Sequence, residues 1–171
     1  MTEAPPKDAP LWHRIAEAQL GVREIPGVRS NPRILDWARK VGRRLGIGYT
    51  SDETPWCGLF VAWCMTAAGF TPPAIAVRAK AWASWGAALE TPGLGAVLVF
   101  ERPGGGHVGF YAGETSLAYR VLGGNQGDAV SHAWIAKDRC VAVRWPPNVP
   151  APAKPVKVVG FPQGELSRNE A

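Results

Sequence analysis

The sequence has few cysteines, and their spacing excludes several uses for them. Only three of the 171 residues are cysteine, namely Cys57, Cys64 and Cys140, so any disulfide would leave one thiol unpaired. If Cys57 and Cys64 lie on one helix, their Cα atoms are about 10 Å apart, beyond the roughly 7 Å that a disulfide allows. That separation also makes them poor joint ligands for zinc, and we expect neither a metal nor another cofactor.

The sequence also lacks any apolar run close to the roughly 20 residues that span a bilayer. Residues 1–6 show neither the basic stretch nor the apolar stretch of a secretory signal. We therefore expect synthesis in a cytoplasm without cleavage, and no stable membrane insertion.

The composition is that of a folded protein with a positive charge. A hydrophobic content of 46% and eight tryptophans indicate one domain with a proper core. The net charge is +5, and the basic residues are scattered through the chain instead of forming a tail. This balance suits a polyanionic partner, either nucleic acid or a bacterial envelope, and it equally suits a solvated basic face.

The hydrophobic pattern predicts helices first and strands later, which indicates an α+β fold with a mainly antiparallel sheet of about five strands. The expected helices cover residues 11–20, 32–41, 57–68 and, as a short one, 77–85. The expected strands cover residues 96–100, 108–112, 118–122, 129–135 and 141–145. We divide the chain into a disordered N-terminus (1–9), one domain (10–146) and a proline-rich tail (147–171) that is dispensable for folding.

Cys57 is predicted to begin a buried helix, because Pro55 stops any earlier helix and an apolar run follows. Free cysteine is more often a small core residue than a nucleophile. A helix N-terminus, however, has unpaired N–H groups and a partial positive charge, which favour the thiolate and lower the thiol pKa. The backbone N–H of Cys57 can also help to form an oxyanion hole. Cys64, two turns further on, is predicted to lie in the core.

A histidine can serve as the base for this thiol. We choose His107, which follows three glycines and begins an apolar strand, over His13 and His132. A third group must accept the remaining imidazole N–H, and the turn at 122–128 offers Asn125 and Asp128. A glycine-asparagine turn selected only for positive φ explains this segment equally well. We rank Glu24, Asp52 and Glu53 behind these residues.

The order of cysteine, histidine and polar residue resembles the papain-like CHAP and NlpC-type peptidoglycan hydrolases. More closely, four segments are similar to the phage-associated, endolysin-like branch of that group. They are TPWCGLFV (54–61), AWASWG (81–86), GHVGFY (106–111) and LGGNQ (122–126). The resemblance covers residues 10–146 and implies a papain-like fold, with the nucleophile helix packed on an antiparallel sheet. It further implies cleavage of an amide bond in the bacterial cell-wall peptide by an endopeptidase or amidase.

By position, the resemblance makes Cys57 the nucleophile, His107 the base and Asn125 the residue that orients the base. Trp56 and Glu53, beside the cysteine, are expected to contact the substrate. The chain departs from the family in three respects: no glutamine precedes the cysteine as an oxyanion donor, Asn125 stands where NlpC-type enzymes often have a second histidine, and the acidic cluster of calcium-binding CHAP domains is missing.

We therefore expect a monomer that acts on peptidoglycan and binds no nucleic acid. It would reach the cell wall or periplasm after release, virion delivery or secretion. The alternative is a non-catalytic module of the same fold that binds the wall or assembles a phage particle.

Overall fold

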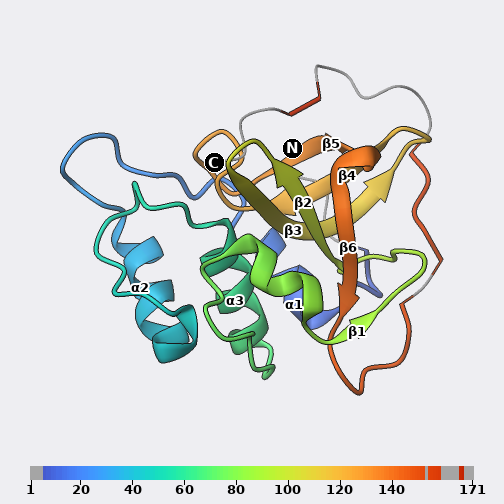
Figure 1. Cartoon of the computed structure of the whole chain (residues 1–171), viewed down its shortest axis with the longest axis horizontal. Coiled ribbons are helices and arrows are strands. Elements are labelled where there is room, and N and C mark those ends of the chain that lie inside the picture. Colours follow the sequence, from blue (N-terminus) through green and yellow to red (C-terminus); the bar gives the residue numbers. More distant parts are fainter. Residues whose placement is uncertain (1–5, 153, 159–165, 168–171) are drawn as a thin grey trace.

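The structure of the chain is a computed structural model, and it describes residues 6–152, 154–158 and 166–167. Among these residues, helices and an antiparallel sheet form one α+β unit, as the sequence predicts. Figure 1 shows the helices gathered on one side of the sheet, and the central helix packs both on another helix and on the strands. No described helix is long and apolar enough to cross a bilayer.

The α-helices begin where the sequence predicts. They are α1 (Leu11–Glu17), α2 (Pro32–Val41) and α3 (Cys57–Ala67). At the start of α2, the side-chain oxygen of Asn31 accepts a hydrogen bond of 2.9 Å from the N–H of Arg33. Pro32 occupies the first turn, where its missing N–H costs no hydrogen bond. The expected short helix near residues 77–85 is a 3-10 helix, η2 (Ala79–Ser84). Two further 3-10 helices, which were not expected, are η1 (Gly42–Leu45) and η3 (Lys137–Arg139).

The sheet has six strands among the described residues, in the order β1-β6-β2-β3-β4-β5, and all its pairings are antiparallel. The five predicted strands are confirmed with boundary shifts of a few residues. They are β2 (Val97–Arg102), β3 (Gly105–Glu114), β4 (Ala118–Gly123), β5 (Ser131–Ala136) and β6 (Cys140–Trp145). The sixth, β1 (Ala87–Ala88), was missed because two exposed alanines carry no alternating pattern.

Helix α3 is the buried centre of the fold. Its residues Leu59, Phe60, Val61 and Ala62 are fully buried, so this part of the helix is enclosed on all sides and not on one stripe alone. Trp37 of α2 lies against one side of it, and Phe110 of β3 contacts Phe60 edge to face. This packing fixes the first turn of α3 relative to β3.

Both ends of the described chain are more ordered than the sequence predicts. Residues 1–5 lie outside the described residues, but Ala9 is buried and its N–H donates to the carbonyl of Pro6. In the proline-rich segment, the N–H of Val158 donates to the carbonyl of Glu114 on β3. Lys157 reaches the Glu114 carboxylate at 3.0 Å. The described part of this segment is therefore docked on the sheet, and the remainder lies outside the described residues.

Candidate active site

Cys57 is the first residue of α3, as predicted, and Trp56 is the residue that caps the helix. The Cys57 side chain is 3% exposed. The next residue, Gly58, must be a glycine, because a Cβ atom there would lie 2.4 Å from the carbonyl oxygen of Ala76. The chain before η2 therefore packs directly on the first turn of α3, beside the thiol.

A cavity of about 340 Å³ opens next to Cys57. One wall comes from the segment before α3, a second from the start of η2, and a third from the first residues of β3. The residues that line it are Ile47, Thr54, Pro55, Cys57, Val77, Arg78, Ala79, Lys80, Gly105 and Gly106. The thiol is thus part of the wall of a space that can hold a ligand.

His107 lies on β3, directly after this wall, and is fully buried. Its Nε2 atom is 2.9 Å from Oε1 of Gln126. The Gln126 amide nitrogen donates to the carbonyl oxygens of Val121 (3.1 Å) and Ser131 (2.7 Å). Because these two bonds direct the amide oxygen at the imidazole, Nε2 of His107 must carry the proton. Nδ1 is then the ring nitrogen that can accept a proton.

Backbone groups of the same strand and of α3 affect the ionisation of the thiol. The backbone N–H groups of Val108 and Gly58 favour the Cys57 thiolate, and so does the positive charge of Arg102. Burial has the larger effect, however, and raises the pKa of the Cys57 thiol above its usual value of 9.0. The expected lowering of this pKa is therefore wrong: the helix N-terminus contributes, but the loss of water outweighs it.

The predicted role of Asn125 needs correction. Its Oδ1 atom accepts a short hydrogen bond from the backbone N–H of Trp56, and its Nδ2 atom donates to Glu24 at 2.7 Å. Glu24 also accepts from the Trp56 indole N–H at 2.7 Å. Asn125 therefore ties the residue before the cysteine to the loop that contains Glu24, and the amide oxygen beside His107 belongs to Gln126.

Gln126 was missed because a neutral amide next to a turn gives no signal of its own in the sequence. The structure explains the position of Gln126 through Gly123. A Cβ atom at Gly123 would lie 2.6 Å from Oε1 of Gln126 and 3.5 Å from Nε2 of His107. Glycine at this position leaves the space that the Gln126 side chain fills. Asp128, the other candidate from the turn, is exposed and has a positive φ of 57°.

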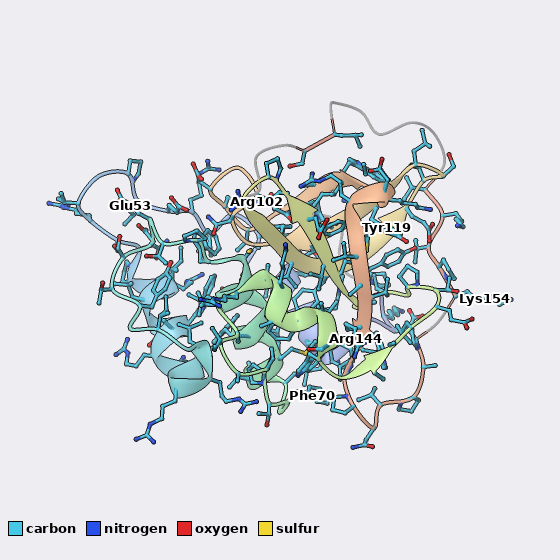
Figure 2. The ribbon with its side chains drawn as sticks, in the orientation of Figure 1. Glu53, Phe70, Arg102, Tyr119, Arg144 and Lys154 are labelled. Atoms are coloured by element: carbon cyan, nitrogen blue, oxygen red, sulfur yellow. The ribbon has the colours of Figure 1, made fainter. Side chains whose placement is uncertain are left out.

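The structure places the two residues that were expected to contact the substrate, Trp56 and Glu53, in different surroundings. Trp56 is fully buried, and its ring packs on Trp37, so it supports the nucleophile loop and has no surface for a substrate. Glu53 is exposed and lies on the outer loop (Figure 2), but it does not line the cavity beside Cys57. Its contact with substrate stays a prediction. Cys64 is fully buried in α3, which agrees with a core residue.

The remaining histidines form a separate cluster. His13 and His132 each place Nε2 at 3.3 Å from the same oxygen of Glu17. Burial opposes ionisation of Glu17, but the hydrogen bonds from both histidines outweigh it and lower its pKa to about 2. No group of three or more metal-binding side chains was found in the described part of the chain.

Comparison with known proteins agrees with this geometry. Residues 49–125 match the family model of the CHAP domain, a stretch that includes Cys57, His107 and Asn125. CHAP domains are generally peptidoglycan hydrolases that act as amidases or peptidases with a cysteine and a histidine. The fold agrees as well, since helices on a six-stranded antiparallel sheet are consistent with the papain-like arrangement of this domain. Searches of curated proteins and of solved structures each returned no match.

Proposed function

We propose that this protein is a cysteine hydrolase that cleaves an amide bond in the peptide of bacterial peptidoglycan. One observation carries the proposal: Cys57 begins α3 and lies in the wall of a cavity, and the two residues of β3 directly before His107 line the same cavity. The match to the CHAP domain supports peptidoglycan as the substrate class. Cysteine catalysis and the choice of bond are our inference.

The reaction begins with a proton transfer from Cys57, whose thiol pKa is raised by burial. His107 accepts the Cys57 proton at Nδ1, while Gln126 holds Nε2–H and thereby the orientation of the ring. The sulfur attacks the amide carbonyl carbon, and the carbonyl oxygen gains the negative charge. His107 then gives the proton to the leaving amine, which leaves a thioester on Cys57. Water, deprotonated by His107, hydrolyses the thioester and restores the thiol.

The developing oxyanion needs hydrogen-bond donors. The first N–H groups of α3 have no acceptor within the helix, and they lie at its partially positive end. We assign the N–H of Cys57 to this role. The position of that N–H depends on Trp56, whose own backbone N–H is held by Asn125. Asn125 therefore supports the nucleophile, and Gln126 supports the base.

The test uses purified sacculi, with the release of free amino groups and mass spectrometry of the fragments as readouts. The wild-type protein should release new amino groups, and the fragment masses identify the bond. Cys57→Ala should release none while it keeps its thermal transition, and Cys64→Ala should retain activity per folded molecule. Equal loss of activity in both folded variants would overturn the choice of nucleophile.

The same experiment tests the rival function. A module that only binds the wall or assembles a particle would sediment with sacculi and release no amino groups. We further propose that the enzyme belongs to the phage-associated branch and reaches the wall after release, virion delivery or secretion. The four motifs that surround Cys57, η2, His107 and Asn125 support this placement.

A further inference from the structure

The rim of the cavity beside Cys57 is cationic. Its charged residues are Arg78 and Lys80, and none of the lining residues is acidic. Both side chains are exposed, so they meet a ligand as it enters. No hydrogen bond or ion pair joins the Arg78 guanidinium to another described residue. The cavity therefore presents positive charge next to the reacting sulfur.

Buried neighbours fix the backbone of the segment that carries these two cations. Trp82 and Ala79 are buried, and the Trp82 indole N–H donates to the carbonyl of Ala76. The N–H groups of Ala76 and Val77 donate to the carbonyls of Arg44 and Leu45, and the Val77 carbonyl lies close to Gly58. The segment is thus fixed against α3 on one side and against η1 on the other. Little backbone entropy remains to be lost when a ligand binds this rim.

The side chain of Lys80 packs against β3. A Cβ atom at Gly106 would lie 3.1 Å from the Lys80 Cγ atom, so the aliphatic stem of the lysine covers the strand directly before His107. The Lys80 ammonium group is 3.8 Å from the Glu101 carboxylate, and both side chains are more than half exposed. An exposed pair at this distance contributes little, so a ligand carboxylate can replace Glu101 as the partner of Lys80.

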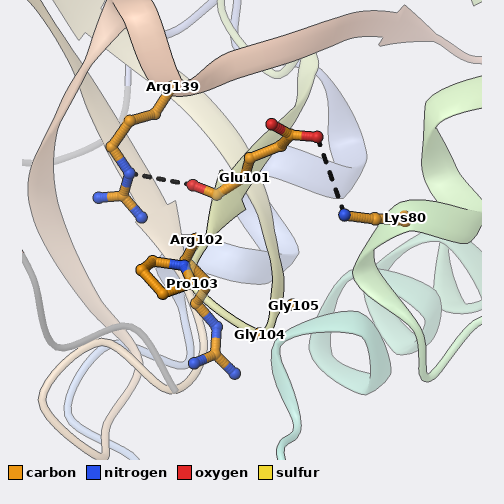
Figure 3. Close-up of a pocket in the computed structure, with 7 residues that line it drawn as sticks. All are labelled: Lys80, Glu101, Arg102, Pro103, Gly104, Gly105 and Arg139. Atoms are coloured by element: carbon orange, nitrogen blue, oxygen red, sulfur yellow. Dashed lines mark hydrogen bonds and ion pairs between the residues drawn. The ribbon is translucent and has the colours of Figure 1, made fainter.

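The positive charge continues beyond the thiol cavity. A second, open cavity of about 600 Å³ shares Lys80 and Gly105 with the first, and Figure 3 shows it at the turn between β2 and β3. Its lining adds Arg102 and Arg139 against the single carboxylate of Glu101. An anionic group that approaches from this side meets an excess of positive charge all the way to the thiol.

We propose that Arg78 and Lys80 form a carboxylate subsite of the active cavity, so that the enzyme cleaves peptides with a free carboxylate close to the scissile amide. This inference rests on the proposed hydrolase function and narrows its substrate class. The carboxylate belongs to the substrate peptide, because the two cations line the same cavity as the sulfur that attacks the amide. The interaction is a charge-assisted hydrogen bond, which a neutral amide in the same place forms less strongly.

The test compares two forms of one substrate. Sacculi are freed of phosphate polymers and made soluble with a muramidase, and half of the material is amidated with carbodiimide and ammonium chloride. Peptide carboxylates are then the anions in the first form and are neutral in the second. The wild-type enzyme should show a kcat/KM about tenfold higher for the free-carboxyl form, which corresponds to one charge-assisted contact.

Variants that remove single positive charges distinguish binding at the subsite from attraction of the substrate by the overall positive charge of the protein. Arg78→Gln and Lys80→Gln should each lower the preference, and the double variant should bring the ratio close to one, mainly through a higher KM. The matched control is Arg14→Gln with Lys154→Gln, which removes two exposed charges that line neither cavity and should keep the tenfold preference.

Each outcome decides a different question. Equal rates on both substrate forms, or a preference that survives in the folded Arg78→Gln, Lys80→Gln double variant, would overturn the subsite and leave the hydrolase function standing. No release of amino groups from either form by the folded wild type would overturn the proposed function, and the subsite with it.

Discussion

At the scale of single residues, Gln126 is the side chain whose removal should affect the chemistry most after Cys57 and His107. Gln126→Ala removes the acceptor that holds the His107 ring, so the ring loses its fixed tautomer and direction. We expect kcat to fall by about 10- to 100-fold with little change in KM, less than the loss for His107→Ala. Steady-state kinetics on soluble peptidoglycan fragments measures this split.

Asp128→Ala is the control for this prediction, because Asp128 belongs to the same turn and is exposed. It should retain wild-type kcat. If the folded Asp128→Ala variant lost more activity than Gln126→Ala, the third member of the site would be Asp128, and the assignment from the hydrogen bond would be wrong.

At the scale of elements, the start of α3 depends on a contact with a loop far away in sequence. Asn125 joins the Trp56 backbone to Glu24, and it does so with a φ of 57°, where alanine would add backbone strain. Asn125→Gly therefore isolates the side chain. It should lower the free energy of unfolding by about 2 kcal/mol, because the buried Trp56 N–H loses its acceptor. Chemical denaturation measures the change.

Asn125→Asp provides the comparison. It keeps an oxygen for the Trp56 N–H but places a second carboxylate beside Glu24, so it should also be destabilised at neutral pH and should recover as the pH falls. Stability equal to the wild type in both variants would show that the contact between the loop and α3 carries no free energy.

The contact between the proline-rich segment and β3 is a second feature at the scale of elements. Glu114 is buried, and its carboxylate contacts Tyr111, Lys137 and Lys157, so deletion of residues 148–171 removes one of its cations and two backbone hydrogen bonds. We expect a folded, active domain that is less stable by about 2 kcal/mol, equivalent to a decrease of roughly 4–8 °C in Tm. Differential scanning calorimetry of the truncated chain measures this. An unchanged Tm would show that the docked segment contributes nothing to stability.

At the scale of the whole molecule, Glu17 connects α1 to β5 through His132, and this connection is sensitive to acid. The folded protein holds the pKa of Glu17 at about 2, below its ordinary value of 4.5. The stabilisation is therefore complete above about pH 5 and is lost as the pH falls towards 2, because the unfolded chain takes up the proton first. Its size is on the order of 2 kcal/mol.

Glu17→Gln should thus be less stable than the wild type at pH 6, and the difference should shrink as the pH falls from 5 to 2. Urea unfolding at a series of pH values measures both proteins. A difference that stays constant over this range would contradict the role assigned to the Glu17 charge.

The sequence by itself determined the α+β class, the five longer strands and the helix start at Cys57, because these depend on local rules. Asn31 and Pro32 start α2 wherever it packs, and alternation of apolar residues defines strands such as β4 without reference to their neighbours. His107 was chosen as the candidate base in the same way, as a polar residue at the start of an apolar strand, and its role as base stays a prediction.

Only the tertiary structure decided what each polar side chain contacts. Asn125 and Gln126 are adjacent amides with the same chemistry, and their roles differ because the space left by Gly123 admits one of them to His107. The raised pKa of Cys57 likewise depends on burial by β3 and the segment before η2, which outweighs the local effect of the helix N-terminus. The cationic rim was also not predicted from the sequence, because Arg78 and Lys80 come to line the same cavity as Cys57 only through tertiary packing.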